Sequence, residues 1–156
     1  DRELERMREK GAAGELEDHI LNASRIMVNI LAEALLREKE EQITVPQFRI
    51  LDMVANLTDK PAEMARMLNI SPSAVTFLLE KLEDRGLLRR SAGTEDRRRV
   101  RIEPTARGRE LVRKVNTRRR GELAKILARM DAGARNHLEA SLKSFRRAYL
   151  ETRGYA

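Results

Sequence analysis

Residues 59–90 constrain the fold more than any other stretch, because they predict two short helices joined by a tight link. The first is expected to begin near the start of this stretch and to end at Leu68. Ser71 is a suitable N-cap for the second, and Pro72 fits its first turn, where a missing N–H leaves no bond unmade. Gly86 is a typical helix stop. The second helix has apolar residues at helical spacing on one face: Val75, Leu78, Leu79 and Leu82. The pair predicts a helix-turn-helix.

A basic β-hairpin is predicted directly after these helices. Residues 87–91 and 100–104 have strand character, and Val100 and Ile102 would lie on the same face of the second strand. Residues 92–99 form the turn between them. A helix-turn-helix followed by such a hairpin predicts a winged helix, so the fold class is mainly α with a small β-hairpin wing.

Longer helices are predicted on both sides of this domain. Apolar residues recur at three- and four-residue steps over 15–41, and a further helix follows Thr44 as its N-cap. Helix resumes after Thr105, can break at Asp131, and continues over 133–150. The expected organisation is an N-terminal helical region (1–43), a winged helix-turn-helix domain (44–108) and C-terminal helices (109–156).

The two ends of the chain offer more apolar surface than a small winged-helix core can cover. We therefore expect them to form a homodimer interface, although an intrachain core is the alternative. The candidate interface residues come from the first and last helices: Leu16, Ile20, Met27, Leu138, Leu142, Phe145 and Tyr149.

Positive charge is concentrated in one segment of the chain. Residues 85–120 contain 14 Arg or Lys against 4 Asp or Glu, a net charge of +10, whereas the whole chain carries +7. The other 120 residues therefore carry −3. Such a concentration is typical of a surface that binds a polyanion, although a solvated basic face with no partner has the same composition.

The composition also argues against several functions. The sequence has no cysteine, which excludes thiol chemistry, and only His19 and His137 are available to a metal. No glycine-rich phosphate loop or nucleophile–base arrangement indicates an enzyme. No apolar stretch approaches the ~20 residues of a membrane span. We expect a cytoplasmic protein without cofactor, metal or membrane partner.

Three blocks of sequence together resemble the MarR (multiple antibiotic resistance regulator) family over about residues 15–150. They are "TVPQFRILDMV", "AEMARMLNISPSAVTFLLEKLEDRGLLRR" and "DRRRVRIEPTARGREL". The last is similar to the family's wing pattern of Asp-x-Arg, a strand, and Thr-x-x-Gly before a helix. The resemblance implies a homodimeric winged-helix repressor or activator on a pseudopalindromic operator. It also implies, less directly, release of DNA by a small, often phenolic, ligand.

Two positions depart from the family pattern. Phe77 stands where many relatives carry an arginine that reaches bases, and Pro104 replaces a leucine at the end of the wing. Pro104 suits a strand end, so little effect on the fold is expected. Phe77 either faces the groove, where it can contact a thymine methyl, or packs against the neighbouring helix or the wing.

Candidate DNA contacts lie on the second helix and on the wing. Hydroxyls in the first turns of the helix can meet phosphates or base edges, and Lys81 suits a phosphate. Arg97 and Arg98 suit a narrow minor groove, with Asp96 pairing one of them, unless that pair is only an exposed ion pair. Arg89, Arg90, Arg99 and Arg101 either follow phosphates or stay solvated. The proposed DNA-binding set is Ser71, Ser73, Thr76, Phe77, Lys81, Asp96, Arg97, Arg98 and Arg99.

The expected function is sequence-specific binding of double-stranded DNA by a homodimeric transcriptional regulator, in repression more than activation. The alternative is a low-specificity architectural DNA-binding protein without ligand control. A small aromatic ligand is a candidate partner, and Arg25, Arg49 or His19 could pair with its carboxylate, although ordinary surface roles are favoured for all three.

Overall fold

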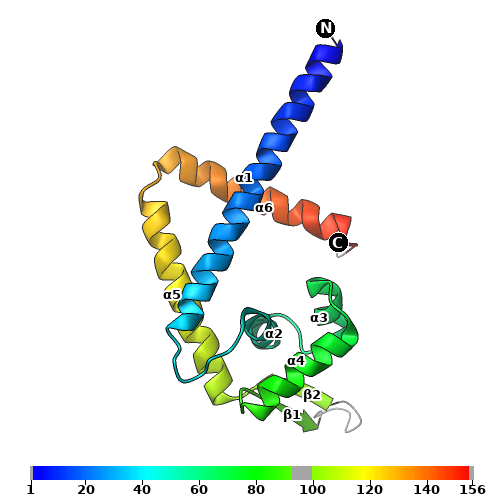
Figure 1. The fold of residues 1–156 in the computed structure, drawn as a ribbon, viewed down its shortest axis with the longest axis vertical. Coiled ribbons are helices and arrows are strands. Elements are labelled where there is room, and N and C mark those ends of the chain that lie inside the picture. The colour runs from blue at the N-terminus through cyan, green and yellow to red at the C-terminus, as the bar shows by residue number, and fades with distance from the viewer. Residues whose placement is uncertain (1, 93–99, 155–156) are drawn as a thin grey trace. The chain divides into compact units, whose positions relative to one another are not determined.

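A computed structural model describes residues 2–92 and 100–154, and the side chains of residues 14–91 and 101–154. Helices dominate, and two short strands lie between the fourth and fifth of them (Figure 1). The elements in chain order are α1 (Arg2–Leu36), α2 (Val45–Asn56), α3 (Pro61–Leu68), α4 (Pro72–Asp84), β1 (Leu88–Ala92), β2 (Val100–Pro104), α5 (Ala106–Ala128) and α6 (Ala132–Thr152). This agrees with the predicted fold class.

The chain forms two compact units, Asp1–Arg119 and Arg120–Ala156. The first contains the hydrophobic core, to which the end of α1, helices α2 to α4, both strands and the first half of α5 contribute. The second contains the end of α5 and the whole of α6, and no residue of α6 is buried.

The core is built from the apolar faces that the sequence pattern predicts. Side chains that are almost completely buried come from α2 to α5 and from the residue before β1: Phe48, Ile50, Leu51, Met64, Val75, Leu79, Leu82, Leu87 and Val115. Burial of each such side chain contributes about 1.5–3 kcal/mol of transfer free energy. The stripe predicted for 72–84 is confirmed, since Val75, Leu79 and Leu82 are buried and Leu78 packs against the cluster.

Polar caps fix where the helices begin. Thr44 accepts a bond from the Gln47 backbone N–H while the Gln47 side chain accepts one from the Thr44 N–H, which closes a capping box at α2. The Ser71 hydroxyl accepts from the Ala74 N–H at α4, and Asp131 accepts from the Ala134 N–H at α6. The N-caps predicted at Thr44 and Ser71 are confirmed, and the helix breaks at Asp131 as predicted, with Asp131 also acting as a cap.

The two strands pair antiparallel, with Leu88 opposite Pro104, Arg90 opposite Ile102, and Ala92 opposite Val100. Ile102 is buried against the core, as expected for its face. Strand β1 lies one residue further along the chain than predicted.

Helix α1 differs from its prediction at both ends. It begins at Arg2, not near residue 15, and ends at Leu36, not near 41. The chain turns after Leu36, where Glu38 N–H bonds to Leu35 O, and Ile43 is then buried in the core. The apolar pattern misses this end because the polar run after Leu36 is as compatible with a helix as with a loop.

Candidate nucleic-acid interface

Helix α4 presents a polar face on the side opposite its buried stripe. Ser71, Ser73, Thr76, Phe77 and Lys81, all predicted to contact DNA, are exposed. They lie in the first three turns, where a recognition helix meets base edges and phosphates. The structure thus brings the five helical members of the predicted site onto one accessible surface.

The hydroxyls of this face also have partners within the protein. Ser71 Oγ caps the helix at 3.2 Å from the Ala74 nitrogen and lies 3.0 Å from Ser73 Oγ. Thr76 Oγ1 donates to the Pro72 carbonyl at 3.1 Å. A hydroxyl has one donor and two acceptor positions, so these bonds leave acceptor capacity toward solvent. The prediction that Ser71 caps the helix is confirmed.

Phe77 is 56% exposed and does not belong to the core cluster. Its ring lies 5.5 Å from Lys81 Nζ, one turn further along the helix. Lys81 Nζ in turn lies 3.8 Å from the Asp84 carboxylate. Phe77 is therefore not buried against the neighbouring helix, whereas the tip of the wing, the other packing surface considered for it, lies outside the described residues.

The arms of the hairpin carry arginines that are engaged in ion pairs. Arg89 pairs with Glu103 at 3.1 Å, and Arg90 pairs with Glu83 of α4 at 2.6 Å. Arg101 lies between Asp59 and Glu103 at 3.7 and 3.6 Å. These pairs fix the arms to each other and to the helical domain. Asp96, Arg97, Arg98 and Arg99, and the predicted Asp96–arginine pair, lie outside the described residues.

Thr105 and Gly108 join the two ends of the hairpin. Thr105 Oγ1 donates to the Gly86 carbonyl at 2.7 Å and accepts from the Gly108 N–H at 3.0 Å. The backbone of α5 passes so close to Leu87 that a Cβ on Gly108 would lie 2.1 Å from the Leu87 oxygen. Gly86 itself has φ of +67°, which a glycine adopts without strain. This geometry explains why the Thr-x-x-Gly pattern follows the wing.

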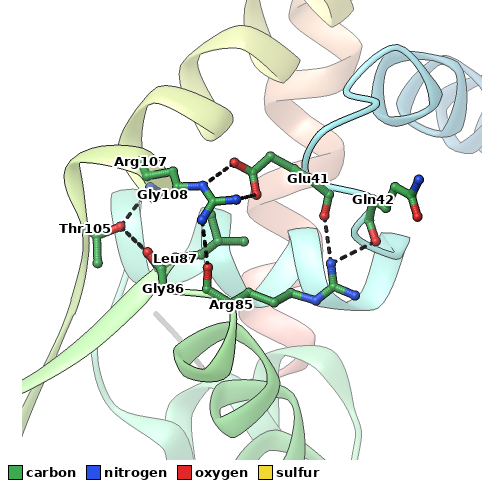
Figure 2. A network of polar contacts seen from close by, with 8 residues as sticks. All are labelled: Glu41, Gln42, Arg85, Gly86, Leu87, Thr105, Arg107 and Gly108. Carbon is green, nitrogen blue, oxygen red and sulfur yellow. Dashed lines mark hydrogen bonds and ion pairs between the residues drawn. The ribbon is translucent and has the colours of Figure 1, made fainter.

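A second set of hydrogen bonds joins the end of α4 and the start of α5 to the loop between α1 and α2 (Figure 2). Arg107 bonds to both carboxylate oxygens of Glu41, at 2.5 and 3.0 Å, and to the Arg85 carbonyl at 3.2 Å. Arg85, just after α4, donates to the Glu41 and Gln42 carbonyls at 2.7 and 3.2 Å. We call Glu41, Gln42, Arg85 and Arg107 the wing-root network. Sequence reasoning missed it.

Known proteins share this arrangement of helices and wing. Residues 43–100 match the model of the MarR family. The HTH-type transcriptional repressor Rv2887 of Mycobacterium tuberculosis is 32% identical over 102 residues, which are 65% of this chain and 73% of that protein. The chain belongs to the MarR family. It is accordingly a winged-helix DNA-binding protein of transcription regulation, and not an enzyme.

Solved structures of other proteins resemble the chain over most of its length. RV1404 from Mycobacterium tuberculosis is 35% identical with a TM-score of 0.71, covering 84% of this chain and 90% of that one. Rv2887 in complex with p-aminosalicylic acid is 27% identical with a TM-score of 0.64, covering 81% and 94%. Streptococcus pneumoniae FabT in complex with DNA is 21% identical with a TM-score of 0.65, covering 85% and 97%, a likeness of fold alone.

The residues proposed for dimerisation are exposed in both units. In α1, Leu16 is 60% exposed, and Ile20 and Met27 are also exposed. In α6, Leu142 and Phe145 are 57% and 56% exposed, and Leu138 and Tyr149 are exposed too. None of the seven belongs to the hydrophobic core of the first unit.

A hollow of about 540 Å³ lies beside α2 in the first unit. Its lining is largely apolar and includes Met27, Leu31, Phe48 and Met53, together with the charged Arg49, Asp52 and Arg119. Of the three residues considered for a ligand carboxylate, Arg49 lines this hollow. Arg25 instead bonds to Asn22 Oδ1 of its own helix at 2.7 Å.

The described side chains contain no group of three or more His, Asp or Glu that could hold a metal ion. Within the same part of the chain, no helix is long and apolar enough to cross a membrane.

Proposed function

We propose that this MarR protein is a homodimeric repressor that binds a pseudopalindromic operator in double-stranded DNA. The observation that carries the proposal is the exposed face of α4 beside a hairpin whose tip contains three consecutive arginines, Arg97 to Arg99. In such a dimer each α4 enters the major groove of one half-site. The wing arginines enter the adjacent minor groove, where the negative potential is concentrated.

The ion pairs of the arginines in the two strands indicate which wing arginines are available to DNA. Ion pairs with carboxylates of the same chain are formed by Arg89, Arg90 and Arg101. An arginine held in an ion pair releases fewer phosphate counterions on binding than a solvated one. The proposal therefore assigns DNA contact to Arg97, Arg98 and Arg99, and stiffening of the hairpin to the arms.

Replacement of Arg97 and Arg98 by Ala tests this assignment. Operator affinity in a gel-shift titration should fall at least about 30-fold, since loss of arginine contacts costs roughly 2 kcal/mol. The fold should be unchanged by circular dichroism. Lys125→Ala with Lys143→Ala removes the same charge from two lysines that are 72% exposed, and affinity should change little. Equal losses in both double variants would contradict the wing assignment.

We further propose that an aromatic carboxylate binds in the hollow beside α2 and releases the DNA. The apolar lining suits an aromatic ring, and Arg49 offers a charged donor to the carboxylate. Rv2887 with bound p-aminosalicylic acid supports a ligand of this class, because that relative is similar over most of this chain.

Salicylate is a suitable probe of the proposed effector. It should bind the wild-type protein in calorimetry and reduce operator affinity, and Arg49→Gln should weaken salicylate binding about tenfold, because a hydrogen bond to a charged group contributes about 1.5–3 kcal/mol. Arg25→Gln, on α1 but outside the hollow, is the matched control. If salicylate at millimolar concentration leaves DNA binding unchanged, the effector proposal fails while the repressor proposal stands.

A further inference from the structure

Phe77 occupies the most outward position of α4. Successive residues of a helix are 100° apart, so Phe77 lies about 200° from both Val75 and Leu79, which are buried. It is the sixth of the 13 residues of α4 and so lies in the N-terminal half of the helix. A large apolar side chain thus points directly away from the core on the helix that faces DNA in a winged helix.

Lys81 is the neighbour that holds the ring in this position. Its ammonium group lies 5.5 Å from the ring centroid, within the range of a cation–π contact. Asp84 then holds Lys81 from the other side at 3.8 Å. Lys81, on the C-terminal side of Phe77, contacts the ring, and the side of the ring that faces away from the core is exposed to solvent. It is therefore presented to a partner, not folded back onto the protein.

The chemistry of a phenyl ring limits what it can read in a major groove. It has no donor or acceptor, so contact with the N7 and O6 acceptors of guanine or the N4 donor of cytosine would desolvate those groups without replacing a bond. The C5-methyl group of thymine is the one apolar group on the four base edges. A ring at this position therefore favours thymine.

We propose that Phe77 recognises the C5-methyl group of one thymine in each half-site of the operator. This inference rests on the proposed function, since it requires α4 to lie in the major groove. It assigns to Phe77 a role in sequence specificity. The base preference at this position is set by an apolar contact and not by hydrogen bonds.

Removal of the methyl group alone tests the proposal. An operator is first selected from random DNA with the wild-type protein. Its thymines are then replaced by deoxyuridine, one symmetric pair of the two half-sites at a time, and the affinity of the protein for each duplex is measured by fluorescence anisotropy. At one pair the affinity of the wild type should fall about 16-fold, because burial of each methyl-sized group is equivalent to roughly a fourfold effect. Phe77→Ala should bind the thymine and deoxyuridine duplexes equally well, whereas Phe77→Leu should keep part of the difference.

Leu36→Ala is the matched control, because Leu36 is also a large exposed apolar residue, at the end of α1. It should leave the thymine preference unchanged. Wild-type affinity that is insensitive to every deoxyuridine pair would overturn the inference and leave the repressor proposal intact. The inference would also be overturned if Phe77→Ala kept the full difference in affinity between the thymine and deoxyuridine duplexes. A wild type that selects no DNA sequence at all would overturn both.

Discussion

At the scale of single residues, Gly108 shows how closely the wing is joined to the domain. A Cβ there would lie 2.1 Å from the Leu87 oxygen, and that oxygen also accepts the Thr105 N–H bond at 3.0 Å. Backbone atoms cannot rotate away as a side chain can. The glycine is therefore required by packing, since its φ is not in the left-handed region.

Gly108→Ala should lower the free energy of unfolding by about 3 kcal/mol, the upper part of the range for an overpacked site. Gly121→Ala in the same helix is the matched control, because nothing lies within 4 Å of the added Cβ. That control should raise stability by about 0.5–1 kcal/mol, as expected for Gly to Ala in an exposed helix. Urea denaturation of both variants measures the two effects. An unchanged free energy of unfolding for Gly108→Ala would contradict the close approach of the α5 backbone to Leu87.

The sequence predicts local residue roles well and distant pairings poorly. Ser71, Gly86 and Asp131 were identifiable because a cap or a helix stop depends on neighbours within a few residues. Glu41 and Arg107 were not, since the contact joins residues 66 positions apart in the chain. The same holds for Arg101, whose partner Asp59 lies before α3. Charge alone does not reveal which arginines are already paired.

At the scale of elements, the wing-root network joins three segments that meet where the hairpin leaves the domain. Glu41 lies in the α1–α2 loop, Arg85 follows α4, and Arg107 opens α5 (Figure 2). The side chain of Glu41 is only 13% exposed, so removal of Arg107 would leave a largely buried carboxylate without its partner. The neighbouring Gln42 has φ of +33°, and its carbonyl accepts from Arg85.

Arg107→Ala should destabilise the fold by about 1.5–3 kcal/mol, the range for hydrogen bonds to charged groups. Arg113→Ala removes an arginine from the same helix whose partner is Glu110, with side chains 65% and 45% exposed. Hydrogen bonds from Arg113 lower the pKa of the Glu110 carboxyl, but this pair is fully solvated, so its removal should cost clearly less stability than the loss of Arg107. Chemical denaturation that gives equal losses for both variants would contradict a structural role for the network.

At the scale of the whole molecule, both units leave apolar side chains uncovered. Leu142 and Phe145 of α6 and Leu16 of α1 are more than half exposed, and these are the residues that the sequence pattern assigns to a dimer interface. The periodicity identified the faces, but it could not say whether they meet within a chain or between chains. In the proposed homodimer these faces meet between chains, and the two-fold axis of that dimer accounts for the two-fold symmetry of the proposed operator.

Selection of bound duplexes from a random DNA pool tests whether two copies of this chain recognise two half-sites. We expect one inverted repeat with half-sites about 10 base pairs apart, or a multiple of that spacing. Leu142→Glu with Phe145→Glu, which charges the exposed face of α6, should remove the selected repeat. Recovery of an unrelated mixture of sequences would indicate a low-specificity architectural protein. Recovery of a single half-site by the wild type would contradict the dimer.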